Sequence, residues 1–250
     1  MVETKTVGSR VFKVVNYIIL TILAISCLYP LWYELCVSLS DKLAADSGAV
    51  TLWPIGVNFA SYELIMGDGT FWNSFMISVG RVVLGTIWTM VVIIMMAYPL
   101  SKKSKEYKPR TILMWVLVFC MLFNGGTIPW YITMQKYNLI DNFAALIFAG
   151  SVPVFNVLLL MNFFRNLPAD IEEAALVDGA GPWRILWTIV VPCSVPVIAT
   201  VVLFTSVGYW NEYFQGLVLM NTEDKYPLQT YIRQITVQIP AGVTLTTEQY

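Results

Sequence analysis

Few residues of this chain could do chemistry, and their types favour charge recognition over bond-breaking catalysis. The 250 residues include no histidine, which removes the commonest general base and metal ligand. The four cysteines form no Cys-x-x-Cys pair, the spacing typical of zinc and redox sites. No Gly-Lys dipeptide is present, so the chain lacks the loop that cradles nucleotide phosphates. We therefore expect no metal, no cofactor, no nucleotide site and no catalytic residue.

One short acidic segment, residues 165–188, separates two long apolar runs. Pro168 suits the first turn of a helix, where its missing N–H would have no partner anyway. Asp170, Glu172 and Glu173 follow, and acidic side chains near a helix start are favoured by the helix dipole. The segment therefore predicts a short helix with a negatively charged beginning.

The same segment carries a helix face and a stop signal. Residues at spacing i, i+3, i+4 and i+7 share one face of a helix. Four residues have this spacing: Ile171, Ala174, Ala175 and Asp178. Gly179 stands where helices commonly end in a left-handed residue, and a second helix is expected to restart near Pro182 and run into the next apolar run. The small alanines would let another surface approach closely, although the pattern taken alone also fits an amphipathic connector on the membrane surface.

A second group of residues could bind a sugar. Sugar rings stack their C–H faces on Trp and Tyr, and their hydroxyls need amide or carboxylate partners. Both kinds of side chain occur near the outer ends of predicted membrane spans: Trp130, Tyr131, Tyr209, Trp210, Asn211, Glu212 and Tyr213. Because Trp and Tyr belts are normal at membrane interfaces, composition alone does not separate sugar contact from interfacial anchoring.

Arg81 lies inside a predicted span. A charge at that depth costs at least about 2.5 kcal/mol on insertion scales, so the guanidinium is expected to face the bundle interior with a partner. Glu212 and Glu34 are the candidate partners, since both lie toward the outer half of their spans. Snorkelling to the external surface is the alternative, because Arg81 is about ten residues from the start of its helix.

Membrane helices must position these residues. The chain is 57% hydrophobic and 12% charged, whereas a soluble domain carries about 25% charged residues. Apolar runs of about 20 residues cross a bilayer as helices. A Gly- and Pro-containing stretch, 124–129, is expected to break the third of these helices near its outer end. We predict an all-α membrane bundle with five transmembrane helices at Val14–Val37, Phe71–Leu100, Thr111–Ile132, Phe143–Phe164 and Ile189–Trp210.

The distribution of Lys and Arg sets the expected orientation. With the N-terminus in the cytoplasm, ten of these residues lie inside and four outside. This orientation predicts a cytoplasmic tail of residues 1–13, a transmembrane domain of residues 14–210 and an external C-terminal segment of residues 211–250. It also places the acidic segment 165–188 in the cytoplasm, where an ATPase could reach it.

The acidic segment resembles the EAA loop of ABC importer permeases. That motif reads Glu-Ala-Ala, three residues, Gly, nine residues, Ile, one residue, Leu, Pro. Its positions are occupied here by Glu173, Ala174, Ala175, Gly179, Ile189 and Pro192, with Val191 in place of the Leu. The resemblance implies a cytoplasmic coupling loop that docks on a separate ATPase. The residues expected to couple are Glu173, Ala174, Ala175, Asp178, Gly179 and Ala180.

Further segments are similar to maltose-type oligosaccharide permeases, especially to permeases for complex polysaccharides or their breakdown products. The matching stretches are 123–129, 137–142, 160–168 and 207–214. The resemblance implies a multi-pass protein of the bacterial cytoplasmic membrane that forms half of a pathway for a sugar or oligosaccharide. The implied partners are a second permease subunit, two ATP-binding-cassette ATPase subunits, an extracellular sugar-binding protein and membrane lipid, with no nucleic acid.

The chemistry above and this resemblance together predict a substrate path. Its expected residues are Arg81, Trp130, Tyr209, Trp210, Asn211, Glu212 and Tyr213. Members of the family normally have six spans, and we expect the last one to be missing here because no apolar run of spanning length follows Trp210. A truncated, non-transporting assembly or regulatory subunit is therefore the alternative function. A membrane-embedded enzyme is disfavoured, because the spans hold no histidine and the acidic cluster lies on the loop.

Overall fold

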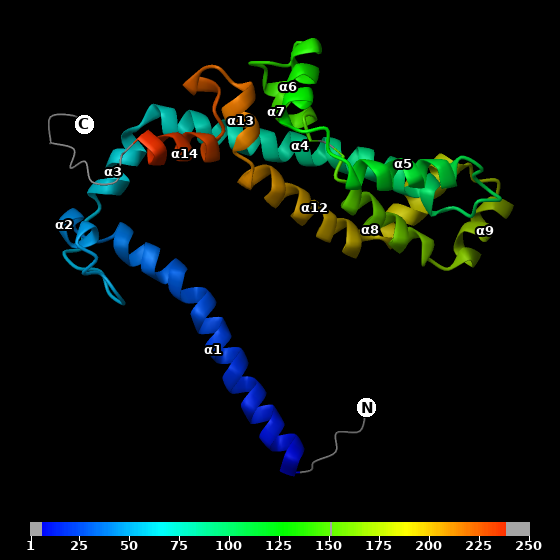
Figure 1. Ribbon diagram of the computed structural model, residues 1–250. Helices are drawn as coiled ribbons and strands as arrows, with labels where there is room; N and C mark the ends of the chain where they lie inside the picture. Colours follow the sequence, from blue (N-terminus) through cyan, green and yellow to red (C-terminus); the bar gives the residue numbers. More distant parts are fainter. Residues whose placement is uncertain (1–6, 151, 239–250) are drawn as a thin grey trace. The chain divides into compact units, whose positions relative to one another are not determined.

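The computed structural model describes residues 7–150 and 152–238, and every regular element in these ranges is helical. The all-α prediction is therefore confirmed for this part of the chain. Two compact units are present, one ending at Asp68 and one beginning at Gly69. Figure 1 labels the helices of both units.

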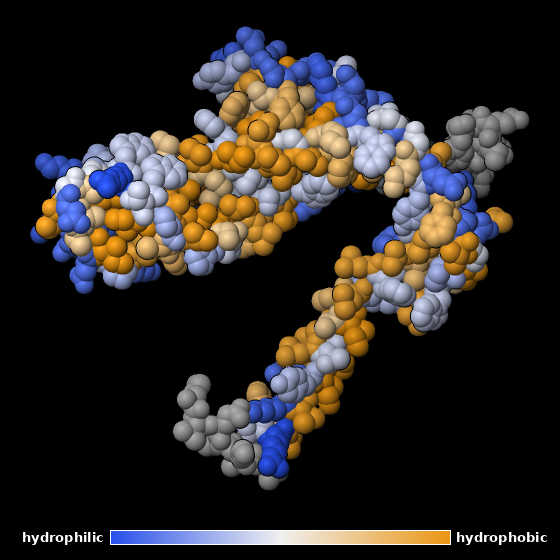
Figure 2. All heavy atoms as spheres, turned by 180° about the vertical axis from the view of Figure 1, so that it is seen from behind, coloured by the Kyte–Doolittle hydropathy of each residue, from blue (hydrophilic) through white to orange (hydrophobic). Residues whose placement is uncertain are grey.

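The first unit is dominated by one long helix, α1 (Val7–Ser38). Its apolar side chains are exposed along almost the whole helix, and Figure 2 shows an apolar surface over most of its visible face. A helix that is apolar all round belongs in lipid. The helix begins seven residues before the predicted Val14, so it extends into the residues assigned to the N-terminal tail.

A loop folds back on the C-terminal end of α1. The Trp32 indole N–H donates to the Leu52 carbonyl at 2.8 Å, and the Ser40 hydroxyl accepts from the Ile55 N–H at 3.0 Å. Val50 is buried in this fold. Two short helices complete the unit, α2 (Lys42–Asp46) and α3 (Ala60–Gly67), so the predicted external segment between the first two spans is an ordered structure.

The second unit is organised around α4 (Gly69–Ser101), which lies within two residues of the predicted span. Helices α8 (Val154–Arg165) and α12 (Val195–Asn211) pack along α4, as Figure 1 shows. The buried side of α4 presents Met90, Ile93, Ile94, Ala97 and Leu100 to the α8 residues Val157, Leu160, Met161 and Phe164. Smaller residues of α4, Gly85 and Thr89 among them, let α12 approach closely.

The third predicted span is broken where the sequence indicated. Helix α5 (Arg110–Leu122) and helix α6 (Thr127–Lys136) meet at 116°. Gly126 lies between them with a φ of 85°, which side chains with a Cβ rarely adopt. The Asn124 side-chain oxygen accepts from the Gly126 N–H at 2.9 Å and fixes the turn.

The fourth predicted span, Phe143–Phe164, is not one helix, and this prediction was wrong. Residues Phe143–Phe148 form α7, and α8 starts only at Val154 after Pro153. Pro153 has no N–H to continue a helix and disfavours helical backbone at the preceding residue. The Asn142 side chain caps the start of α7 by accepting from the Ala144 N–H at 2.9 Å.

The fifth predicted span, Ile189–Trp210, is also interrupted. A helix that restarts at Pro182, as predicted, runs through α10 (Pro182–Ile185), a π-helical turn (Leu186–Val190) and α11 (Val191–Cys193). It then meets α12 at 84° instead of running straight into it. Pro196 near the start of α12 cannot donate to the preceding turn, so the bend falls at Ser194 between Pro192 and Pro196.

Residues after α12 fold against α4 and α7. They form α13 (Phe214–Leu219), a 3₁₀ turn (Glu223–Lys225) and α14 (Leu228–Gln238). Within the described residues, α1 and α4 are long and apolar enough to cross a membrane, and the two bent pairs bring the possible spans to four. Helix α8 is apolar but has only 12 residues, so the count of five spans and the cytoplasmic N-terminus stay predictions.

Candidate functional site: a capped acidic helix and a buried arginine cluster

The acidic segment folds as the short helix α9 (Ala169–Val177). Pro168 is its N-cap residue, one position before the first turn in which the sequence placed it. Asp170 and Glu172 lie in the first turn, where the exposed N–H groups and the helix dipole favour negative charge. The local sequence thus explains where α9 begins.

Gly179 ends α9 as the sequence predicted, with a φ of 75°. The Gly179 N–H donates to the Leu176 carbonyl at 3.0 Å, and the Ala180 N–H donates to the Ala175 carbonyl at 2.9 Å. These two bonds are the Schellman arrangement, which satisfies the last carbonyls of a helix. Gly181 follows as the N-cap of α10, whose first residue is Pro182.

The predicted coupling residues do not all share one surface. Glu173, Ala174, Asp178 and Gly179 are exposed, whereas Ala175 is buried in the core that α4 and α8 form. Ala180 is half-buried and also packs against this core. The small side chain at 175 therefore lets α9 approach its own bundle, and the outward surface consists of the exposed four.

Sequence reasoning missed the partner of Glu172. Its carboxylate forms an ion pair with the ammonium of Lys102, the residue directly after α4. The same ammonium lies 4.3 Å from the centre of the Tyr98 ring. The charge distribution assigned both Lys102 and Glu172 to the cytoplasmic side, and this was the one sequence signal for the contact. Because 70 residues separate the two, the sequence did not indicate that they pair.

Arg81 faces the bundle interior with Glu212 as its partner, so one of the two predicted carboxylates is confirmed. The side chain is only 1% exposed, and Nη2 lies 2.7 Å from Glu212 Oε2. Nη1 donates to the Glu212 carbonyl at 2.8 Å, Nε to the Leu146 carbonyl at 3.0 Å, and Nη2 also to Gln215 Oε1 at 2.5 Å. This burial rules out the snorkelling alternative for this residue.

Tyr209 belongs to the same cluster. Its hydroxyl donates to the Ile147 carbonyl at 2.9 Å and lies 2.9 Å from the Thr89 hydroxyl. A Cβ added at Gly85 would come within 2.7 Å of the Tyr209 ring, so the ring lies directly on the α4 backbone. The α4 backbone therefore covers one part of the Tyr209 ring. The stacking on a sugar that the sequence predicted for Tyr209 is restricted to the rest of the ring surface.

A polar cavity of about 170 Å³ opens beside this cluster. Its polar lining residues are Arg81, Thr89, Asn156, Thr205, Tyr209, Glu212 and Gln215, and apolar atoms complete the wall. Asn156 of α8 donates to the Thr205 hydroxyl of α12 at 3.2 Å. Thr89, Asn156, Thr205 and Gln215 were not among the predicted residues, although an amide inside an apolar run, as at Asn156, is a usable sequence signal.

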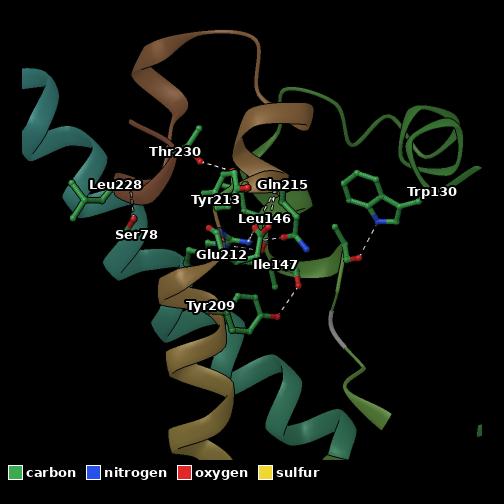
Figure 3. Close-up of polar contacts among 12 residues, drawn as sticks. Ser78, Trp130, Leu146, Ile147, Tyr209, Glu212, Tyr213, Gln215, Leu228 and Thr230 are labelled. Atoms are coloured by element: carbon green, nitrogen blue, oxygen red, sulfur yellow. Dashed lines mark hydrogen bonds and ion pairs between the residues drawn. The ribbon is translucent and has the colours of Figure 1, made fainter. Parts of the chain in front are cut away.

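The other predicted path residues lie apart from this cavity. Figure 3 shows Glu212 and Gln215 side by side, Tyr209 pointing to Ile147, and Trp130 on a separate element. The Trp130 indole N–H donates to the Ala149 carbonyl at 3.1 Å. Trp210 packs edge-on against Phe75, Asn211 is exposed, and the Tyr213 carbonyl accepts from the Thr230 hydroxyl. The structure therefore groups three of the seven residues: Arg81, Tyr209 and Glu212.

An ion pair orders the loop between α6 and α7. Asp141 has a φ of 58°, and its carboxylate contacts the ammonium of Lys225. Two hydrogen bonds hold the pKa of Asp141 below its usual value. The larger effect comes from the Lys225 ammonium and the smaller one from the Asn221 N–H. Within residues 7–150 and 152–238, no three His, Cys, Asp or Glu side chains converge as a metal site.

Comparisons with known proteins agree with this arrangement. The family described as "Binding-protein-dependent transport system inner membrane component" matches residues 6–246. The chain is 34% identical over 232 residues to Protein LplC of Bacillus subtilis, covering 93% of this chain and 78% of the relative. It is also 34% identical over 229 residues to the B. subtilis polygalacturonan/rhamnogalacturonan transport system permease protein YtcP, covering 92% and 79%.

A solved structure gives the same result at the level of the fold. A chain from a bacterial ABC transporter involved in the import of the acidic polysaccharide alginate superposes with a TM-score of 0.88 and 32% identity. The match covers 99% of this chain and 86% of that one. These similarities favour transport over the non-transporting alternative. The chain belongs to the binding-protein-dependent inner membrane component family and is a permease subunit of a sugar or oligosaccharide ABC importer.

Proposed function

We propose that this permease couples to a separate ATPase through α9 and forms half of the translocation pathway with a second permease subunit. An external sugar-binding protein would deliver the substrate. The family supports this kind of assembly, since its description names a binding-protein-dependent system. The substrates named for the relatives, polygalacturonan, rhamnogalacturonan and alginate, suggest a polysaccharide fragment of one of these kinds.

The observation that carries the coupling proposal is the C-terminal end of α9, which is hydrogen-bonded within the chain and exposed at its surface. Two hydrogen bonds satisfy its last turn, so the helix end does not depend on the ATPase for its shape. Glu173, Ala174 and Asp178 remain exposed beside it. A small residue between two acids gives a surface that another protein can approach closely and recognise by charge.

The pathway proposal rests on the polar cavity. Arg81, Asn156, Thr205, Glu212 and Gln215 line it with donors and acceptors, while the surrounding helices are apolar. Because the Arg81 charge is already paired with Glu212, the hydrogen bonds that the cavity offers to sugar hydroxyls would come mainly from its amide and hydroxyl groups. Polar and ionisable side chains inside membrane spans are rare and commonly line substrate pathways, which supports the proposal that this cavity is part of the route.

Docking is tested with a charge reversal in the complete complex. Glu173→Lys should reduce co-purification of the ATPase subunits and the hydrolysis that loaded binding protein stimulates, because the wrong charge then stands on the docking surface. Glu223→Lys is the matched control, since Glu223 is also exposed but lies in the segment after α12. Normal docking and uptake with Glu173→Lys would show that α9 is a passive connector.

Orientation is tested with single cysteines in intact cells. A thiol at Ser104 should react only from the cytoplasm, and thiols at Asp46 and Asn221 only from outside. All three positions are exposed in the structure, so a negative result would not come from burial within the chain. External labelling at Ser104 would reverse the orientation and remove the basis for ATPase docking at α9.

A further inference from the structure

Helix α9 is attached to the rest of its unit at few points. Ala175 is its one buried residue, and the Lys102–Glu172 ion pair is its charged contact. Cavities of about 530 Å³ and 460 Å³ border the contact between α9 and the end of α4, and Lys102, Glu172 and Leu176 line both of them. A helix that borders open space can shift more easily than one packed in a core. Apart from the chain segments that join α9 to α8 and α10, Ala175 and the ion pair are the contacts through which a shift would act.

The ion pair connects α9 to the C-terminal end of α4. Lys102 directly follows α4, and the guanidinium of Arg110 fixes the same end by donating to the Leu100 carbonyl at 2.9 Å. The side chains of Lys102 and Glu172 are only 20% and 24% exposed, so water screens their attraction less than at an open surface. The pair is therefore a direct charged link between α9 and the end of α4.

Helix α4 carries the second charged contact at its other half. Arg81 stands 21 residues before Lys102, which is about 32 Å along a helix at 1.5 Å per residue. That distance is close to the thickness of a bilayer core, about 30 Å. One continuous helix thus joins the coupling helix to the residues that line the polar cavity, Arg81 and, through it, Glu212 and Gln215.

We propose that Glu172 and Lys102 are positioning residues that transmit movement of α9 to α4 and so to the polar cavity. Glu172 differs in this from its neighbour Glu173, which is exposed and available to the ATPase. The two neighbouring acids then have different roles: Glu173 contacts the ATPase, and Glu172 holds α9 to the bundle. This inference rests on the proposed docking of α9, and its test separates the two.

The test uses a cysteine reporter in the cavity and needs no transported sugar. Gly208 lines the cavity, and a Cβ there meets nothing within 4 Å, so Gly208→Cys fits. In the complete complex, with the native cysteines replaced, the labelling rate of this thiol is measured with and without ATP and vanadate. Lys102→Glu and Glu172→Lys should each reduce the nucleotide-dependent change by about fivefold or more, the scale of ordinary allosteric coupling.

The charge swap and two controls make the result specific. The double variant Lys102→Glu with Glu172→Lys should restore the response, because the pair re-forms with opposite signs. Lys103→Glu makes the same charge change at an exposed neighbour and should leave the response intact. Combining Lys102→Glu with Glu173→Lys should restore nothing, since Glu173 is not the partner. Melting temperature and the amount of bound ATPase should stay close to wild type in all the Lys102 and Glu172 variants.

Several outcomes would overturn the proposal. An unchanged response in both single variants, or no restoration in the swap, would show that the pair transmits nothing. The absence of any nucleotide-dependent change at Gly208→Cys in the otherwise wild-type complex would show that α4 does not carry movement to the cavity. Loss of ATPase binding with Glu172→Lys would place Glu172 on the docking surface instead. By contrast, full ATPase binding and activity with Glu173→Lys would refute docking at α9 itself.

Discussion

Replacing Gly179 with alanine should weaken coupling, because this residue closes α9 with a φ of 75°. A Cβ at a left-handed position costs roughly 1–2 kcal/mol. The added Cβ would meet no atom of the chain within 4 Å, so the cost comes from the backbone alone. A loss of 1–2 kcal/mol corresponds to a factor of about 5–30 in an equilibrium constant, and we expect the ratio of correctly closed to open α9 to fall by that factor.

Gly181 supplies a matched control two residues away. A Cβ added there would also meet no atom within 4 Å, but the φ of −75° and ψ of 165° at Gly181 suit any residue. Gly181→Ala should be neutral or slightly stabilising, by about 0.4–1 kcal/mol, because alanine lowers the entropy of the unfolded chain. The assay is ATP hydrolysis stimulated by loaded binding protein in the complete complex, at matched membrane levels. Equal activities of the two alanine variants would refute the backbone argument.

A series at position 179 separates backbone strain from a clash with the ATPase. Asparagine tolerates the left-handed region better than alanine, and β-branched valine tolerates it worst. Backbone strain therefore predicts activity in the order Gly, Asn, Ala, Val. A steric clash with a docked partner predicts that Asn is worse than Ala, because Asn is larger. Finding Asn below Ala would show that Gly179 matters for the size of the interface and not for the end of the helix.

Three further predictions concern the Arg81 cluster and the segments that pack near it. Arg81→Met and Glu212→Gln should each lower the thermal stability of the purified complex, by up to about 3–5 kcal/mol for a broken buried pair, and the double variant should cost less than the sum; additive losses would show that the pair has no coupling energy. Gly216→Ala drives a Cβ into the Thr230 hydroxyl and should separate α13 from α14, seen as faster proteolysis after α12; an unchanged digestion pattern would contradict this. The pKa of Asp141 is lowered in the folded state, so its ion pair stabilises the loop between α6 and α7 above the usual carboxyl pKa and is lost as pH falls below about 4. Chemical labelling of this loop should therefore increase in acid. Asp141→Asn should abolish that increase, and a transition that persists in the variant would assign it to another group.

Hydropathy predicted the long helices well but not the interruptions in the shorter ones. Helix α4 was placed within two residues, because a run of that length and apolarity has few alternatives in a membrane. The break near Gly126 was predicted from Gly and Pro together. The breaks at Pro153 and Ser194 were missed, because summed hydropathy is the same for a straight helix and for two helices that meet at an angle. The prolines beside both breaks were a local signal for them, but the length of each apolar run favoured a single straight helix.

The candidate site was predictable where the signal was local. The left-handed Gly179 and the start of α9 follow from residues a few positions apart. The pair of Arg81 with Glu212 could be named only as one of two options, since 131 residues separate the partners. Lys102 with Glu172, and the contribution of Asn156 to the cavity, were missed because each depends on which helices pack together. Packing of α4 against α8 and α12 is a property of the whole unit that spacing along the chain does not encode.

Polar contacts have a particular role in fixing the register of α4. Lipid tails are as apolar as leucine side chains, so apolar contacts alone give little preference for one helix register over another in a membrane. Polar contacts recur along α4: the Ser78 hydroxyl accepts from the Leu228 N–H at 2.7 Å, Arg81 binds Glu212, the Thr89 hydroxyl contacts the Tyr209 hydroxyl, and Lys102 at its end binds Glu172. Sliding α4 by one turn would leave the Arg81 charge buried without its partner, which costs far more than the apolar contacts exchanged. The charges that make the helix expensive to insert therefore also specify where it sits relative to α9 and the polar cavity.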